Sequence, residues 1–289
     1  MGMSRSPKNG KQEFRSDTPN SPATLRARLS DDERLWVIGL QEELRTTPDL
    51  DEISDWDIAC HAIVAKGDSA KAIQRLRRLK QFQQYYKVPQ HPTVYEAIRT
   101  MHDFCHAHPD FIQAIGCDAS GRWVLSFQLK AWTCPGQQEP PLLSVERELA
   151  ALFFLLKALQ PDLDSVRKGT IWIGDLEGIT RQTLSLSSVR GARALCRDAF
   201  PIRIEDAPCW NTPPKLSAAY AFCRPFFSPH LTEKLVWDCT PELLTKHLPK
   251  HVLCRALGGT QSRNDVMDVL EENLARRFES QQTFRLDLK

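Results

Sequence analysis

The segment 170–259 constrains the fold more than any other part of the chain. It opens with a short apolar run that ends in acidic residues, TIWIGDLEG (Thr170 to Gly178), which is typical of a buried parallel strand that stops at a loop. Apolar residues then recur at helical spacing from Ser185 to Phe200, and a second strand-like run, PIRIEDAPCW, follows. Because parallel strands need a crossover between them, this order predicts a right-handed βαβ unit.

An unusually apolar helix is expected next. The second strand stops at Asn211, and Pro213 and Pro214 are placed to begin a helix. The following run, KLSAAYAFCRPFFSP, is apolar nearly all round, and the segment closes with a pair of glycines in CRALGGT. We expect this helix to cover the βαβ unit as a lid.

Five features of this segment occur in the order and spacing of the CRAL-TRIO lipid-binding domain. They are DLEG after a strand, FP before the next strand, N-x-P at its end, RPFF in the following helix, and LP…GG near the close. The chain therefore resembles this family, most closely the animal branch that contains α-tocopherol transfer protein and cellular retinaldehyde-binding protein. The resemblance implies an α/β fold, in which a sheet flanked by helices holds an apolar lipid pocket beneath a gate helix at about Asn211 to Lys234.

The remaining chain divides into regions with different patterns. Residues 1–29 are rich in Ser, Pro and charged residues without apolar periodicity, so we expect a disordered tail. Residues 30–90 predict a small helical domain, which the resemblance identifies with the family's N-terminal domain. The lipid-binding domain then takes residues 91–262, and residues 263–289 form a C-terminal helix and tail.

Local patterns place the helices of the N-terminal region. Ser30 and Glu33 form a capping box ahead of the first helix. The second helix is expected from Asp55 to Ala65 and the third from Ser69 to Tyr86, where apolar residues fall on one stripe.

Three further expectations concern the central part of the chain. Alternating residues from Phe111 to Trp132 predict a hairpin. The helix expected from Leu142 to Gln160 carries consecutive large hydrophobic residues over more than one face, so it is buried on both sides or lines a cavity. Pro208 falls inside the second strand of the βαβ unit, where it removes a donor, so that strand should bulge or end early.

Bulky hydrophobic side chains are in excess on elements that we expect to meet at one sheet face. A close-packed core is the alternative interpretation, since large empty apolar cavities are rare in proteins. The family resemblance favours a lipid pocket. Its expected lining residues are Phe127, Leu129, Phe153, Phe154, Ile171, Ile173, Ala192, Leu195, Cys196, Phe200, Ile202, Tyr220, Phe226 and Phe227.

Comparison with the resembled proteins narrows the range of lipids that we expect as ligand. Gly174 stands where α-tocopherol transfer protein has an aromatic residue, and Ala192 and Cys196 are also smaller, which widens the pocket and argues against tocopherol itself. Ile202 stands where yeast phosphatidylinositol-transfer relatives have a Glu that binds the headgroup. A neutral isoprenoid, retinoid, tocopherol-like or acyl lipid is therefore favoured over phosphatidylinositol.

The resemblance also implies a basic surface around the gate. Arg203, Arg224 and Lys234 match positions that contact phosphoinositide headgroups in the animal relatives, whereas His230 and Glu205 replace two expected cations. Arg and Lys near an anionic membrane favour peripheral binding. A solvated surface without a partner is the alternative.

Two other functional classes remain as alternatives. Asp175 and Glu177 lie at the carboxyl end of a strand, where an α/β enzyme could use them for Mg²⁺ binding or acid–base chemistry. The chain has no P-loop, G-x-S-x-G, H-E-x-x-H or G-x-G-x-x-G motif, so we expect no enzyme activity, no cofactor and no metal. A regulatory adaptor that senses a lipid without transferring it is the second alternative.

The composition limits the partners and the cellular environment that we expect for this protein. A formal net charge of +2 argues against nucleic-acid binding. Nine scattered Cys residues without a C-x-x-C pair are typical of reduced core residues. The longest apolar run, Leu149 to Gln160, contains Lys157 and is too short to span a bilayer. We expect a monomeric cytoplasmic protein that contacts membranes transiently.

Overall fold

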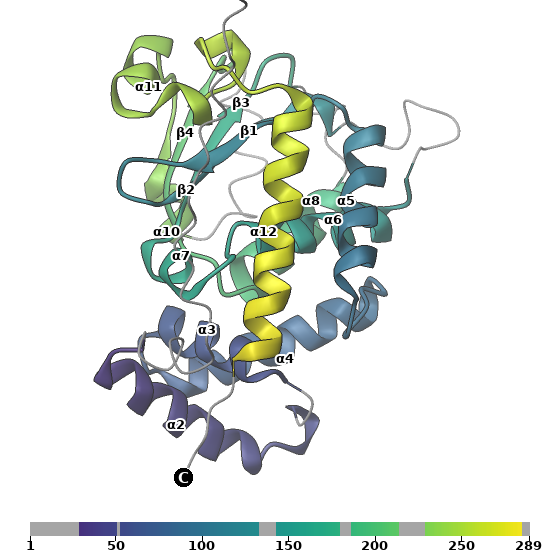
Figure 1. Cartoon of the computed structure of the whole chain (residues 1–289), viewed down its shortest axis with the longest axis vertical. Helices are drawn as coiled ribbons and strands as arrows, with labels where there is room; N and C mark the ends of the chain where they lie inside the picture. Colours follow the sequence, from purple (N-terminus) through teal and green to yellow (C-terminus); the bar gives the residue numbers. More distant parts are fainter. Residues whose placement is uncertain (1–28, 51–52, 133–142, 180–185, 214–228, 285–289) are drawn as a thin grey trace, which may run out of the picture.

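The computed structural model describes residues 29–50, 53–132, 143–179, 186–213 and 229–284 (Figure 1). It consists of a sheet with helices on both faces and a group of helices at one end. Most of the expected tail 1–29 lies outside the described residues, as do most of the expected gate helix and the last residues of the chain.

The N-terminal region forms the three helices that the sequence predicts. Ser30 caps the first, since its hydroxyl accepts a hydrogen bond from the Glu33 amide while the Glu33 carboxylate accepts one from the Ser30 amide. Trp56 and Leu76 are almost fully buried in a core that these helices share. The elements are α2 (Asp31–Arg45), η1 (Pro48–Leu50), α3 (Asp55–Ala65) and α4 (Ser69–Tyr85).

The sheet has five strands in the order β1-β2-β3-β4-β5. The first two strands are antiparallel, which confirms the predicted hairpin, and the others are parallel, which confirms the predicted βαβ unit. The short fifth strand was not predicted. The bounds are β1 (Ile112–Cys117), β2 (Trp123–Gln128), β3 (Thr170–Asp175), β4 (Ile204–Trp210) and β5 (Leu235–Val236).

The fourth strand contains the predicted irregularity, but not at its proline. Thr170 pairs with Ile204 whereas Ile171 pairs with Asp206, so one extra residue, Glu205, bulges from β4. The strand continues through Pro208 and ends at Trp210. Pro208 is tolerated because its ladder partner on one side is only the short strand β5.

Helices cover the two faces of the sheet unequally. One face packs against α5 (Val94–Ala107), α6 (Val145–Ala158), α8 (Leu186–Arg193), η3 (Ala194–Ala199) and α12 (Arg263–Thr283). η3 is a π-helical extension of α8, and together they form the predicted crossover helix. The opposite face packs against α11 (Pro241–His247), η5 (Lys250–Val252) and η6 (Arg255–Leu257). Three short elements complete the fold: η2 (Leu129–Ala131), α7 (Leu163–Lys168) and α10 (Pro229–Lys234).

The long C-terminal helix joins the two parts of the molecule. In Figure 1, α12 (yellow) runs along the molecule from the sheet to the N-terminal helices. It contacts β1 near its beginning and α3 near its end, and it packs against α5 and α6 between them. Because Leu270 and Leu274 of this helix are fully buried, α12 belongs to the hydrophobic core that the sheet shares with α5 and α6.

The glycine pair at the end of the segment 170–259 makes a close backbone turn. Gly258 has a φ of 78°, in the left-handed region that favours glycine. A Cβ atom on Gly259 would lie 1.8 Å from the carbonyl oxygen of Leu253. This contact is with the backbone, so rotation of a side chain cannot relieve it.

We predict that Gly259→Ala lowers the free energy of unfolding by about 1–3 kcal/mol or more, because the loop must move to relieve the clash. Gly39→Ala in the middle of α2 is the control, since a Cβ atom there meets nothing within 4 Å. That change should raise the free energy of unfolding by about 0.5–1 kcal/mol. Urea titration of the three proteins measures both effects, and equal stabilities would contradict the prediction.

Candidate functional site

The side chains expected to line one pocket lie on both faces of the sheet. Leu125 and Phe127 of β2 face the helical layer, whereas Ile171 and Ile173 of β3 pack into the core on the opposite face. The expectation of a single shared face is therefore wrong for Ile171 and Ile173, because successive side chains of a strand point to opposite faces. Leu129 follows the strand in η2 and packs in a small cluster with Leu176 and Ile179.

Several of the expected pocket residues pack against one another in the hydrophobic core. The ring of Phe153 contacts those of Phe154 and Phe200 edge to face, with centroid distances of 5.4 and 5.7 Å. Phe153, Phe154 and Phe200 are at most 2% exposed. Leu195 and Ile202 are buried in the same cluster, and Ala192 and Cys196 pack against it while only partly buried.

A row of half-buried aromatic side chains lies on the sheet face that looks toward the helices. Phe127 and Trp172 are neighbours on β2 and β3, with ring centroids 6.3 Å apart. Trp123 and Trp132 are likewise only partly buried against this core. Trp123, Trp132 and Trp172 were not among the expected lining residues, although the alternation of Trp172 with Ile171 and Ile173 could have indicated the face that Trp172 occupies.

The gate itself falls mostly outside the described residues. Tyr220, Arg224, Phe226 and Phe227 all lie within 214–228, so their expected roles stay predictions. The described end of the expected gate is α10, which contacts β4.

Asp175 of the DLEG motif acts as a hydrogen-bond acceptor at the ends of three strands. Its carboxylate accepts hydrogen bonds from the side chains of Asn211 and Gln128 and from the amide of Glu177. Asp175 is buried, whereas Glu177 is exposed in the turn. These hydrogen bonds occupy both carboxylate oxygens of Asp175. This pattern resembles that of a carboxylate that stabilises a turn. Within the described ranges, no group of three His, Cys, Asp or Glu side chains could hold a metal ion.

Only part of the expected basic surface is described. Arg203 forms an ion pair with Glu205 at 2.8 Å and donates a hydrogen bond to the carbonyl of Arg167 at 2.9 Å. The positive charge of Arg203 is therefore already paired with a carboxylate of the same chain. Lys234 ends α10 and is partly exposed.

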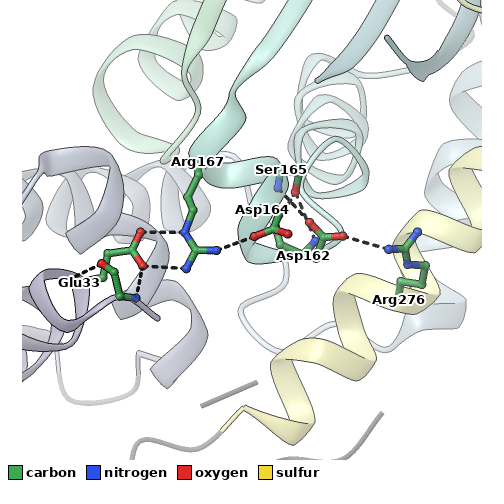
Figure 2. A network of polar contacts seen from close by, with 7 residues as sticks. Glu33, Asp162, Asp164, Ser165, Arg167 and Arg276 are labelled. Atoms are coloured by element: carbon green, nitrogen blue, oxygen red, sulfur yellow. Dashed lines mark hydrogen bonds and ion pairs between the residues drawn. The ribbon is translucent and has the colours of Figure 1, made fainter. Parts of the chain in front are cut away.

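A polar network fixes the N-terminal helices to the sheet domain and to α12 (Figure 2). Arg167 of α7 binds the Glu33 carboxylate through two nitrogens at 2.8 and 2.7 Å, and Asp164 at 2.6 Å. Asp162, the N-cap of α7, accepts a hydrogen bond from Arg276 of α12. Burial raises the pKa of Glu33, but the hydrogen bonds and charge of Arg167 outweigh burial, so the pKa lies below its ordinary value.

A second set of charges is buried deeper in the same junction. The Arg277 guanidinium is 0% exposed, contacts the Trp56 ring at 4.7 Å, and forms an ion pair with Asp57 at 2.8 Å. Lys157 of α6 is 4% exposed, and its ammonium lies over the rings of Phe153 and Phe278. Burial lowers the pKa of Lys157 to about 8, although the negative charge of Asp57 acts to raise this pKa.

Two cavities among the described residues are relevant to binding. An open groove of about 440 Å³ lies between Tyr86 and the beginning of α6, near Ser144 and Arg147. A smaller cavity of about 70 Å³ lies at the junction, and Phe153, Lys157 and Phe200 belong to its lining. Among the helices that the structure describes, none is long and apolar enough to cross a bilayer.

The depressed pKa of Lys157 predicts a pH dependence of stability. Between its folded value of about 8 and its ordinary value of 10.5, the folded protein loses a proton that the unfolded chain retains. The free energy of unfolding should therefore rise with pH across this window, by an amount on the order of 3 kcal/mol if the whole shift is expressed.

Urea unfolding of the wild type and of Lys157→Met at about pH 7.5 and about pH 10 measures this effect as a difference between the proteins. The comparison is needed because burial raises the pKa of the neighbouring Cys60 thiol to about 12, which acts in the opposite direction in both proteins. A stability difference that does not change with pH would contradict the prediction.

Comparison with known proteins agrees with this architecture. The family model described as the CRAL/TRIO domain matches residues 111–259. The crystal structure of Sfh5 has a similar fold, with a TM-score of 0.53 and 13% sequence identity over 83% of this chain and 91% of that chain. No curated protein matches the sequence. Neither match assigns a branch within the family. Because the matched segment covers more than half of the 289 residues, the chain belongs to the CRAL/TRIO domain family.

Proposed function

We propose that this protein binds one hydrophobic lipid against the sheet face that carries Phe127 and Trp172, and moves it between membranes. Membership in the CRAL/TRIO family supports lipid binding as the general function. The proposal depends on one observation, the difference between the two faces of the sheet. Val124, Ile171 and Ile173 on the opposite face are at most 3% exposed, whereas Phe127 and Trp172 are only partly buried.

Half-buried aromatic rings favour an apolar ligand. Each Å² of apolar surface that leaves water contributes about 25 cal/mol, so a long hydrocarbon chain on this face gains several kcal/mol. The indole nitrogen of Trp172 is buried without a hydrogen-bond partner in the described structure. It could donate a hydrogen bond to a single hydroxyl or carbonyl oxygen of the ligand.

The ligand we propose is a neutral isoprenoid, retinoid, tocopherol-like or acyl lipid. Ile202 is 6% exposed in the helical core and offers no charge to a phosphoinositol headgroup. Ala192 and Cys196, both partly buried against the same core, have small side chains, which supports a branched or cyclic chain as the ligand.

The mechanism we propose involves no covalent chemistry. The gate segment opens at an anionic membrane, the lipid exchanges, and the gate closes again. The hydrogen bonds that Asp175 accepts support a structural role over an enzymatic one.

Phe127→Gln should reduce the fraction of protein that carries a lipid by about tenfold or more, because it replaces apolar contact area with an amide. Leu243→Gln is the control, since Leu243 is 46% exposed on α11. Native mass spectrometry of the purified proteins measures the lipid-bound fraction, and circular dichroism checks the fold. Equal lipid occupancy in both variants would refute binding at this face.

Lipid exchange separates transfer from the adaptor alternative. Protein loaded with its cellular lipid is incubated with acceptor vesicles and then recovered. Movement of the lipid to the vesicles supports transfer, whereas a lipid that stays bound supports a sensor that does not transfer.

Peripheral membrane binding is the second part of the proposal. Lys234→Gln should weaken binding to phosphoinositide vesicles by about fivefold, since a cation near an anionic surface contributes around 1 kcal/mol. Arg203→Gln should change binding less, because Glu205 already pairs with Arg203. Vesicle co-sedimentation at fixed salt measures both, and a larger effect of Arg203→Gln would reverse this assignment.

A further inference from the structure

The smaller cavity has features of a second binding site, separate from the aromatic row on the sheet. It lies where the N-terminal helices meet α6 and α12, and its volume is about 70 Å³. One water-sized group needs about 10–15 Å³ of such space, so the cavity has room for several. Its lining combines apolar side chains from α4, α6 and the end of η3 with polar ones from α3, α4 and α12.

Lys157 supplies a buried cation to this cavity. Its ammonium contacts the faces of two rings, with Nζ 4.9 Å from the centroid of Phe153 and 5.3 Å from that of Phe278. Among the described residues it has no hydrogen-bond acceptor. An ammonium carries three donors, so Lys157 can donate hydrogen bonds to an acceptor that enters the cavity.

The groups around Lys157 leave its charge uncompensated. Asp57 forms its ion pair with Arg277, so these two charges offset each other. Burial lowers the pKa of His61, whose ring nitrogens contact the carbonyls of Asp57 and Ala199, so this imidazole is neutral. The thiol of Cys60 is also neutral, because burial raises its pKa to about 12.

A second polar group at the cavity lacks a partner. The side-chain oxygen of Gln281 on α12 is buried without a hydrogen bond in the described structure. Rotation of the amide exchanges this oxygen for its NH₂ group, so Gln281 can present a donor to an anion.

We propose that the cavity binds a short-chain monocarboxylic acid. The carboxylate accepts hydrogen bonds from Lys157 and Gln281, and the alkyl chain contacts Leu76, Leu79 and Phe200. The lining carries two lysines, Lys80 and Lys157, and one carboxylate, Asp57, which already pairs with Arg277, so the cavity favours an anion over a neutral ligand. The apolar half of the lining disfavours inorganic phosphate, which would place charged oxygens against hydrocarbon.

Such a ligand would stabilise the attachment of the N-terminal helices. It contacts α4, α6 and α12 together, and it binds only when these elements are assembled, so binding adds to the stability of the folded chain. This inference does not depend on a lipid at the sheet face.

Butyrate is the probe for this site. Calorimetric titration of the full chain with butyrate should show saturable binding at one site, and n-butanol and butylammonium should not bind there. Lys157→Met should weaken butyrate binding by about tenfold or more, since a hydrogen bond to a charged group is lost. The matched control is Lys250→Met, because Lys250 is exposed in η5 and should leave the affinity unchanged.

Gln281→Glu gives an independent test, because it adds a carboxylate to the cavity wall. We expect this variant to melt at a higher temperature than the wild type and to lose butyrate binding. The proposal is overturned if the wild type shows no saturable binding, which would mean that the cavity holds water only. It is also overturned if Lys157→Met or Gln281→Glu binds butyrate as tightly as the wild type. Native mass spectrometry of retained lipid is a separate measurement, so failure of the lipid proposal would be recognised independently.

Discussion

The buried ion pair between Asp57 and Arg277 is the interaction on which the arrangement of the two parts of this molecule depends. Taking two charges out of water costs several kcal/mol per ion, and the cost is offset only when the geometry is good. The N–O distance of 2.8 Å and the contact of Arg277 with Trp56 favour this pair, and the 21% exposure of Asp57 lowers its desolvation cost, whereas Arg277 Nε is buried without a hydrogen-bond partner in the described structure. Since Asp57 comes from α3 and Arg277 from α12, the pair holds the end of α12 against the N-terminal helices. Nearer the surface, Arg167 of α7 pairs with Glu33 of α2, and Arg276 of α12 pairs with Asp162 at the beginning of α7, so α7 connects the same two parts indirectly (Figure 2).

The sheet carries two faces with different packing. On one face, α11, η5 and η6 bury Val124, Ile171 and Ile173 almost completely, which is the close packing expected of a protein core. On the other face, Leu125 is buried, but Phe127 and Trp172 keep part of their surface. Between α6, η3 and the N-terminal helices, Phe153 packs against Phe200, and the small cavity beside Lys157 lies next to these rings. The structure therefore separates rings that are buried in the core from rings that keep exposed surface on the sheet.

Local patterns were sufficient to predict much of this fold. The capping box of Ser30 and Glu33, the end of α3 at Ala65 and the alternation along β2 depend on residues close in sequence, and the structure confirms each of them. The two residues of β5 carry too short a pattern to predict a strand, and they pair only because β4 provides an edge. The π-helical turns of η3 also escape prediction, because its apolar residues fit an α-helical stripe equally well.

The sequence by itself determined the order of the longer helices and strands and the βαβ unit, since these follow from hydrophobic periodicity, and its short motifs indicated the family. Only the tertiary structure decided which side chains share a surface. Ile171 and Trp172 are adjacent in the chain yet face opposite layers, and Phe153, expected in the lipid pocket, packs at the junction beside Lys157. Likewise, the environment of Lys157 depends on Asp57 and Arg277, which are distant in sequence. Periodicity specifies the face of an element, whereas long-range packing determines what that face meets.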